Sequence, residues 1–169
     1  RSSDNATQDI GFVAGNFDAA AFSAFIGAGN GFVTKWYDQS GSGKDASQGT
    51  AADQPQLLLS QTNGRPALTG DGTQFLATAS FASGTSPESF AAVAERTGSV
   101  TSIGYIADAA NNNAMGFQNS ANKAALYATG TAPTASASDS SWHSLIGVVN
   151  GASSVLTVDG TDTSGSNTA

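Results

Sequence analysis

Carboxylates are the side chains of this chain that could support acid–base chemistry, and the spacing of the glutamates argues against it. Paired carboxyl groups hydrolyse glycosidic bonds when they lie about 5–10 Å apart on either side of the bond. Glu88 and Glu95 are the only glutamates in the sequence. On one extended strand, at about 3.3 Å per residue, they would lie about 20 Å apart and on opposite faces. The two glutamates are therefore not expected to form a catalytic pair.

Nucleophiles and bases of the usual kinds are also scarce. The sequence contains no cysteine and one histidine, His143. The lack of cysteine excludes a thiolate nucleophile and a cysteine-ligated zinc site. Ser144 follows His143 directly, so the two side chains would point to opposite faces of a strand and would not form a Ser-His-Asp arrangement. We expect His143, beside Trp142, to pack as a structural residue.

Oxygen ligands offer a different chemistry, because calcium binds carboxylate and carbonyl oxygens. The candidate calcium ligands are Asp38, Asp45, Asp71 and Asp108, although no stretch has the spacing of an EF-hand loop. The alternative is that these carboxylates accept hydrogen bonds from the backbone of their own turns. No other cofactor is expected.

A cluster of aromatic, amide and acidic residues is the candidate ligand site. Aromatic rings beside hydrogen-bonding groups suit a sugar, which presents both apolar faces and hydroxyls. The densest such group surrounds a hairpin expected at residues 109–114, and its members are Tyr105, Asp108, Asn111, Asn112, Asn113, Gln118, Asn119 and Tyr127. The alternative is an asparagine-rich hairpin tip that is simply solvated. Trp36 and Trp142 lie in apolar segments and are expected in the core.

Many short antiparallel strands are expected to position these residues. Asn-Gly and Asp-Gly pairs, which favour the type I′ turns of hairpins, occur at residues 30–31, 63–64, 71–72, 150–151 and 159–160. Segments rich in strand-forming residues lie between them, at 32–37, 56–59, 74–78, 89–95, 100–106, 142–149 and 154–158.

Only one stretch has helical periodicity. Asp18 is a suitable N-cap, Phe22, Phe25 and Ile26 recur at helical spacing, and Gly27 is expected to end the helix. Residues 129–141 are rich in Ala, Ser and Thr and show neither helical nor strand periodicity, so they are predicted to form a long loop.

Composition limits the partners. The 169 residues suit one domain, and both ends resemble cuts from a longer protein. Charged residues make up 11% of the chain, with a net charge of −7 and no basic run, so nucleic acid is not an expected partner. No apolar stretch approaches the roughly 20 residues of a membrane-spanning helix, so membrane insertion is not expected. More than half of the chain is Ala, Ser, Gly or Thr, which suits an exported or assembled surface.

Two blocks carry a family resemblance: residues 1–11 and the segment 33–41, which contains Trp36-Tyr37-Asp38-Gln39-Ser40-Gly41. Together they resemble the N-terminal part of the fungal-type α-L-arabinofuranosidase B catalytic domain. The same blocks are similar to concanavalin A-like lectin or LamG-like domains of bacterial and phage surface proteins, as are residues 63–76, 141–145 and 156–160. The resemblance implies a single all-β domain over residues 1–169: a concanavalin A-like antiparallel β-sandwich (jelly roll) with one short helix, incomplete at both ends. Any missing strands would be disordered, cleaved away or supplied by another chain.

The resemblance also bears on activity. It places Asn119 where the hydrolases carry their nucleophile, and an amide cannot form a glycosyl-enzyme intermediate. The acid of that family would fall beyond Ala169.

We therefore expect a non-catalytic, carbohydrate-facing recognition or adhesion module of a phage virion or bacterial surface protein. Its location would be extracellular or on the virion or cell surface, and its partner a glycan or cell-surface polysaccharide. The first alternative is a structural decoration domain whose open sheet edges pair with neighbouring subunits of a particle. An arabinofuranosidase-like hydrolase is the other alternative.

Overall fold

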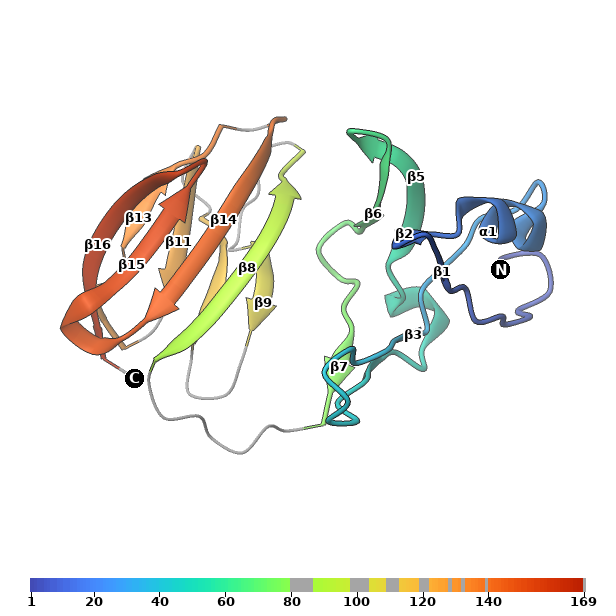
Figure 1. Ribbon diagram of the computed structural model, residues 1–169, viewed down its shortest axis with the longest axis horizontal. Coiled ribbons are helices and arrows are strands. Elements are labelled where there is room, and N and C mark those ends of the chain that lie inside the picture. Colours follow the sequence, from blue (N-terminus) through green and yellow to red (C-terminus); the bar gives the residue numbers. More distant parts are fainter. Residues whose placement is uncertain are drawn as a thin grey trace. The chain divides into compact units, whose positions relative to one another are not determined.

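The computed structural model describes residues 1–79, 87–97, 104–108, 113–118, 122–127, 129–131, 133–138 and 140–168. Within them the chain is mostly antiparallel β-structure with one α-helix, which confirms the predicted all-β class. The chain forms two compact units, residues 1–79 (unit 1) and 80–169 (unit 2), which are described separately (Figure 1). Among the described residues, no helix has both the length and the apolar character needed to span a membrane.

The helix of unit 1 is the one that the sequence predicts. Helix α1 spans Ala19–Ile26, and the carboxylate of Asp18 accepts a 2.9 Å hydrogen bond from the backbone N–H of Ala21. Gly27 ends the helix with a φ of 58°, a left-handed conformation that glycine adopts without strain. Phe22 is the buried side chain of α1 and meets the ring of Phe17 edge to face at 5.7 Å.

The strands of unit 1 are short and form three small antiparallel sheets. One is the hairpin of β1 (Phe12–Val13) and β2 (Asn16–Phe17), and another joins β5 (Gln56–Thr62) to β6 (Arg65–Thr69). The third contains β3 (Lys35–Trp36), β4 (Ala46–Ser47) and β7 (Ala77–Thr78), and a 3₁₀ turn, η1, covers Ala51–Asp53. The strands predicted at 32–37 and 74–78 are therefore present only as two-residue strands.

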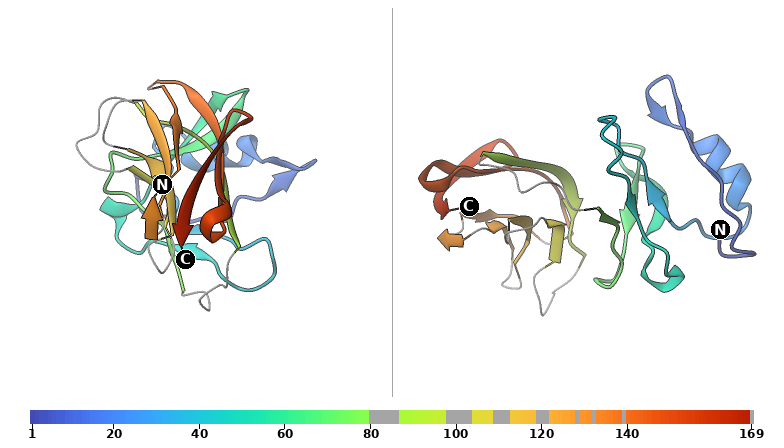
Figure 2. Two further views of the ribbon diagram at one scale, coloured as in Figure 1. Left: turned by 90° about the vertical axis from the view of Figure 1, so that its left-hand side faces the viewer. Right: turned by 90° about the horizontal axis from the view of Figure 1, so that it is seen from below.

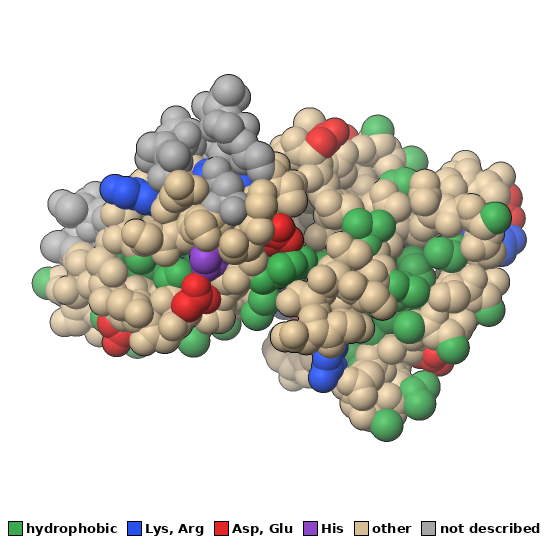
Figure 3. All heavy atoms as spheres, turned by 90° about the horizontal axis from the view of Figure 1, so that it is seen from above, with side chains coloured by type: hydrophobic (Ala, Val, Ile, Leu, Met, Phe, Trp, Pro, Cys, Tyr) green, Lys and Arg blue, Asp and Glu red, His purple; other side chains and the backbone are tan. Residues whose placement is uncertain are grey.

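Unit 1 leaves much of its apolar surface uncovered. Phe22 is its only buried large hydrophobic side chain among the described residues, whereas Phe12 and Trp36 are 66% and 57% exposed. The prediction that Trp36 lies in the core is therefore wrong, because β3 pairs on one side only and its strand neighbours are exposed too. Hydrophobic side chains reach the surface of unit 1 at many points (Figure 3).

Unit 2 contains two antiparallel sheets that lie as separate layers (Figure 2). The four-stranded sheet has the order β13-β11-β10-β9, with β9 at Gly104–Asp108, β10 at Ala114–Phe117, β11 at Lys123–Tyr127 and β13 at Thr134–Ser136. The five-stranded sheet has the order β12-β16-β15-β14-β8, with β8 at Glu88–Glu95, β12 at Thr129–Thr131, β14 at Trp142–Val149, β15 at Ser154–Val158 and β16 at Thr161–Thr168. A 3₁₀ turn, η3, covers Gly151–Ser153.

The inner faces of both sheets build one core. Alternate residues of β14 and β15 are buried, as a strand with one covered face requires. From the four-stranded sheet the core takes Met115, Phe117, Ala124, Leu126 and, after β13, Ala137; from the five-stranded sheet it takes Leu145, Val149, Leu156 and Val158. In β14 the side chain of Trp142 points away from the core, on the side opposite to Leu145 and Val149, and it is half-buried. The prediction that Trp142 lies in the core is therefore wrong.

Two local predictions need correction. Residues 129–141 are not a long loop, because β12 and β13 lie within them: backbone pairing across the sheets overrides a composition without periodicity. Of the five predicted type I′ turns, Asn63-Gly64 and Asp159-Gly160 have positive φ at both residues. The other pairs lack it: Asn150 has a φ of −148° and leads into η3, and Gly72 is left-handed without Asp71.

Candidate functional site

A β-bulge in the four-stranded sheet gathers the predicted ligand residues. Across the β9–β10 pair, Asp108 lies opposite Ala114, but Tyr105 lies opposite Gly116, and the register shifts between Met115 and Gly116. In a regular strand Tyr105 and Asp108, three residues apart, would point to opposite faces. The extra residue of the bulge puts both on the face that points away from the core, which we call the outer face.

Tyr127 joins this group from the neighbouring strand. Ala114 pairs with Tyr127 on β11, so Asp108, Ala114 and Tyr127 form one row across three strands. The rings of Tyr105 and Tyr127 meet edge to face, with centroids 5.8 Å apart and planes at 72°. Residues two apart on β10 are about 7 Å apart, which sets the spacing between the row of Tyr105 and the row of Asp108.

Small residues occupy the positions next to the two tyrosines on the outer face. Ala114 and Ala125 are buried to 1% and 0% exposure, and Gly116 is buried between them. Gly116 has no room for a side chain, because a Cβ there would lie 2.9 Å from Cα of Tyr105 and closer still to the carbonyl oxygen of Gly104. Tyr105 itself is 54% exposed, so its ring is accessible on the outer face.

The Tyr127 hydroxyl is the polar end of the aromatic pair. Burial raises the pKa of Tyr127, and the nearby Gln118 amide lowers it by a smaller amount. By strand alternation Gln118, which follows β10, faces the same side as Gly116, so the structure brings Tyr105, Asp108, Gln118 and Tyr127 to one face.

Asn113 is separated from this group. It is 1% exposed and points between the sheets, where its Nδ2 donates a 2.7 Å hydrogen bond to Glu88 of β8. Glu88 is thereby a link between the two layers, and Glu95, at the other end of β8, lies opposite Trp142. The predicted ligand residues Asn111, Asn112 and Asn119 lie outside the described residues.

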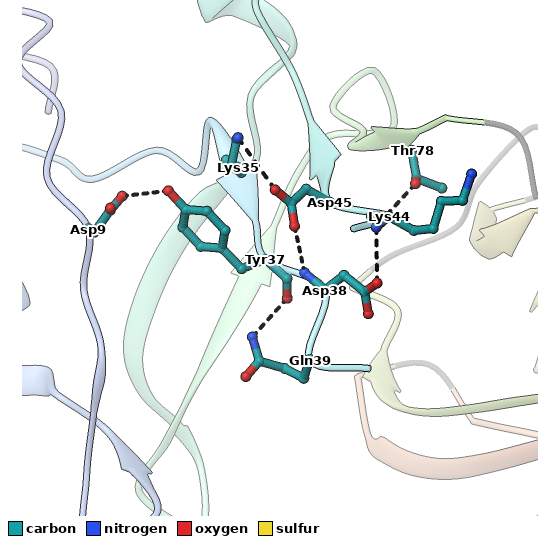
Figure 4. Close-up of polar contacts among 8 residues, drawn as sticks. All are labelled: Asp9, Lys35, Tyr37, Asp38, Gln39, Lys44, Asp45 and Thr78. Atoms are coloured by element: carbon teal, nitrogen blue, oxygen red, sulfur yellow. Dashed lines mark hydrogen bonds and ion pairs between the residues drawn. The ribbon is translucent and has the colours of Figure 1, made fainter. Parts of the chain in front are cut away.

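The aspartates predicted as calcium ligands act as turn acceptors where the structure describes their contacts. The two carboxylate oxygens of Asp38 accept hydrogen bonds from the backbone N–H groups of Ser40 at 2.7 Å and Lys44 at 3.0 Å. Asp45 accepts one from the N–H of Asp38 at 2.9 Å and lies 3.5 Å from Nζ of Lys35 (Figure 4).

The hydrogen bonds of Asp38 with Ser40 and Lys44 are the chief cause that lowers the pKa of its carboxyl group to about 2. Asp71 accepts hydrogen bonds from the N–H and hydroxyl of Thr73 in the same way. Among the described residues, no three His, Cys, Asp or Glu side chains lie together as a metal site would require. Asp108, the fourth predicted calcium ligand, is exposed on the outer face described above.

His143 has partners that the sequence did not reveal. Its ring is buried on the inner face of β14, and Nδ1 lies 2.6 Å from the carboxylate of Asp159. Nε2 lies 3.0 Å from the carbonyl oxygen of Ser138 and 3.4 Å from the hydroxyl of the same residue. Ser144 is exposed, as its place on the opposite face predicts. Asp159 follows His143 by 16 residues, so only the antiparallel pairing of β14 with β15 reveals the contact.

No protein-family model matches the chain, and no curated protein or solved structure shows detectable similarity to it. The resemblance to concanavalin A-like, LamG-like and arabinofuranosidase domains therefore stays a prediction.

Proposed function

We propose that unit 2 is a non-catalytic carbohydrate-recognition module that binds a glycan on the outer face of its four-stranded sheet. The observation that carries the proposal is the bulge at Met115/Gly116, which puts the exposed ring of Tyr105 and the carboxylate of Asp108 on one face. Bulges commonly re-aim a side chain next to a functional site.

The chemistry of the face suits a sugar ring. A pyranose or furanose has an apolar C–H face that packs on an aromatic ring, and hydroxyls around its rim that donate to a carboxylate. Tyr105 supplies the ring, held in place by its edge-to-face contact with Tyr127. Asp108, in the next row of the sheet, supplies the acceptor at about the width of one sugar ring.

The same geometry favours binding over hydrolysis. Glycosidases need two carboxyl groups about 5–10 Å apart. Among the described residues of unit 2, Asp108 is the one carboxylate on the outer face with Tyr105, since Glu88 turns inward to Asn113 and Glu95 belongs to the other sheet. With a net charge of −7, the protein is expected to prefer neutral or cationic glycans to acidic ones.

A glycan array probed with the full chain and its variants tests the proposal. Tyr105→Ala removes the ring and is expected to abolish binding, whereas Tyr105→Phe keeps the ring and should bind like the wild type. Asp108→Asn keeps the shape and loses the charge, so its binding should weaken without disappearing.

Ile146→Ala is the matched control, because Ile146 is 49% exposed on the opposite layer of the same unit. The proposal fails if no glycan binds the wild type, or if Ile146→Ala weakens binding as much as Tyr105→Ala does.

One observation favours the alternative of an assembly role. β8 is an eight-residue edge strand that pairs with β14 on one side, and within the described strands its other edge is unpaired. An open edge of this length can add a strand from a neighbouring subunit. Sedimentation of the full chain distinguishes the recognition role from the assembly role. A monomer at high concentration argues against self-assembly, and an oligomer that Ala91→Pro disrupts would support self-assembly.

A further inference from the structure

His143 lies where three parts of unit 2 meet. It belongs to the inner face of β14, Asp159 belongs to the turn between β15 and β16, and Ser138 belongs to the segment that leads from β13 to β14. That segment passes from one sheet to the other. Ala137, within it, is buried and donates a 2.8 Å hydrogen bond to the carbonyl of Asn122.

Both ring nitrogens of His143 face acceptors. Nδ1 is 2.6 Å from a carboxylate oxygen of Asp159, and Nε2 is 3.0 Å from the carbonyl oxygen of Ser138. A neutral imidazole carries one N–H and therefore satisfies one of them, whereas the imidazolium donates to both. In the neutral form with the proton on Nδ1, the lone pair of Nε2 would face the lone pairs of the carbonyl oxygen. The geometry thus fits the charged ring.

Among the described residues, few charged groups lie near the ring. Of these, Asp159 contacts the ring, and its other oxygen accepts the N–H of Ser144 at 2.9 Å. On β8, Glu95 pairs with Trp142 and so faces the opposite side of the sheet from His143. The buried Arg96 donates to the carbonyl of Gln118 and stacks near the ring of Phe117. Lys123, on β11, is exposed and pairs with Ser136 of β13.

We propose that protonated His143 is a pH-sensitive latch that ties the segment of Ala137 and Ser138 to the turn of Asp159, and that loss of its proton releases the segment. The latch is a single ring that contacts the carboxylate of Asp159, in a turn of the five-stranded sheet, and the backbone carbonyl of Ser138, in the segment that joins the two sheets. Ser140, two residues beyond Ser138, donates to the carbonyl of Arg96, which follows β8, so release is expected to weaken this hydrogen bond too.

The same contacts argue against Ser138, His143 and Asp159 acting as a catalytic triad. A general base needs a free lone pair on Nε2 to accept the serine proton. Here Nε2 lies closer to the carbonyl oxygen of Ser138, at 3.0 Å, than to the hydroxyl, at 3.4 Å. The nitrogen is placed to donate, and a protonated histidine does not act as a base.

The direction of the pH effect follows from both partners. Burial lowers the pKa of His143, but Asp159 and the Ser138 carbonyl outweigh it and raise the pKa above 6.5. The latch is therefore complete below 6.5 and is lost as the pH rises through the folded-state pKa. The hydrogen bonds from His143 and Ser144 lower the pKa of Asp159 below 3.8, so the latch persists down to that lower pKa and is lost beneath it.

NMR of the full chain tests the latch directly, because His143 is its only histidine and needs no assignment. Long-range ¹H–¹⁵N spectra across a pH series should show both ring nitrogens protonated at pH 6 and a titration midpoint above 6.5. Hydrogen exchange of the Ala137 and Ser140 amides, corrected for intrinsic pH dependence, should accelerate about five- to tenfold with the same midpoint, as expected for one lost hydrogen bond.

Two variants sharpen the result. Asp159→Asn keeps the left-handed turn, which asparagine tolerates, and should lower the His143 midpoint. Ser138→Ala keeps the backbone carbonyl and should leave the midpoint unchanged. A titration midpoint of His143 at or below pH 6.5 in the wild type would overturn the proposal, whether or not the variants fold. So would amide exchange rates of Ala137 and Ser140 that do not change as His143 titrates.

Discussion

Filling the bulge with a methyl group tests how the candidate site is built. In Gly116→Ala the new Cβ would lie 2.9 Å from Cα of Tyr105 and closer still to the carbonyl of Gly104, and both contacts are backbone atoms that cannot rotate away. β9 must therefore shift by about 1 Å, and overpacking of this kind costs about 1–3 kcal/mol of unfolding free energy. In urea that cost lowers the unfolding midpoint by about 1 M. Because the shift moves Tyr105 relative to Asp108, glycan binding should fall as well.

Gly104→Ala is the matched control for this experiment. Gly104 lies on the facing strand, yet a Cβ there meets no atom within 4 Å. Its substitution should leave the midpoint unchanged or raise it slightly, since alanine has less backbone entropy to lose on folding than glycine. Equal midpoints for Gly116→Ala and Gly104→Ala would refute the bulge as we describe it.

Three further predictions concern the core, the helix and the corner of unit 1. Leu126→Ala removes a fully buried side chain from the shared core and should cost about 2–5 kcal/mol in urea unfolding; a loss below about 1 kcal/mol would show that the two sheets do not share that core. Asp18→Ala removes the N-cap of α1 and should cost about 1 kcal/mol, whereas Asp18→Asn, a good cap, should cost little. The ionised Asp38 stabilises its turn above its usual pKa of about 4 and ceases to do so as the pH falls toward about 2, so Trp36 fluorescence should change over that range. Asp38→Asn should abolish the change, and an unchanged titration in that variant would assign it to another group.

The sequence predicts elements whose signals are local. The cap of Asp18 and the stop at Gly27 define α1, and runs of strand-forming residues predict β14 and β15 at their observed bounds. The turns at Asn63-Gly64 and Asp159-Gly160 follow from residues that accept positive φ.

What the sequence does not predict depends on contacts between distant segments. β13 consists of Thr134, Ala135 and Ser136, which have no periodicity and become a strand by pairing with β11. The bulge depends on the close approach of Gly104 and Gly116, and without it Tyr105 and Asp108 would face opposite sides. The residue types of the candidate site were therefore predictable, whereas the face that unites them was not.

Titration of the ¹⁵N-labelled full chain with the tightest-binding oligosaccharide from the array tests the central claim most directly. We expect the backbone amides of Tyr105, Asp108 and Tyr127 to shift with a single binding curve, while those of Val93 and Ile146 on the opposite layer stay in place. Shifts confined to the opposite layer or to unit 1, or the absence of any binding oligosaccharide, would contradict the account.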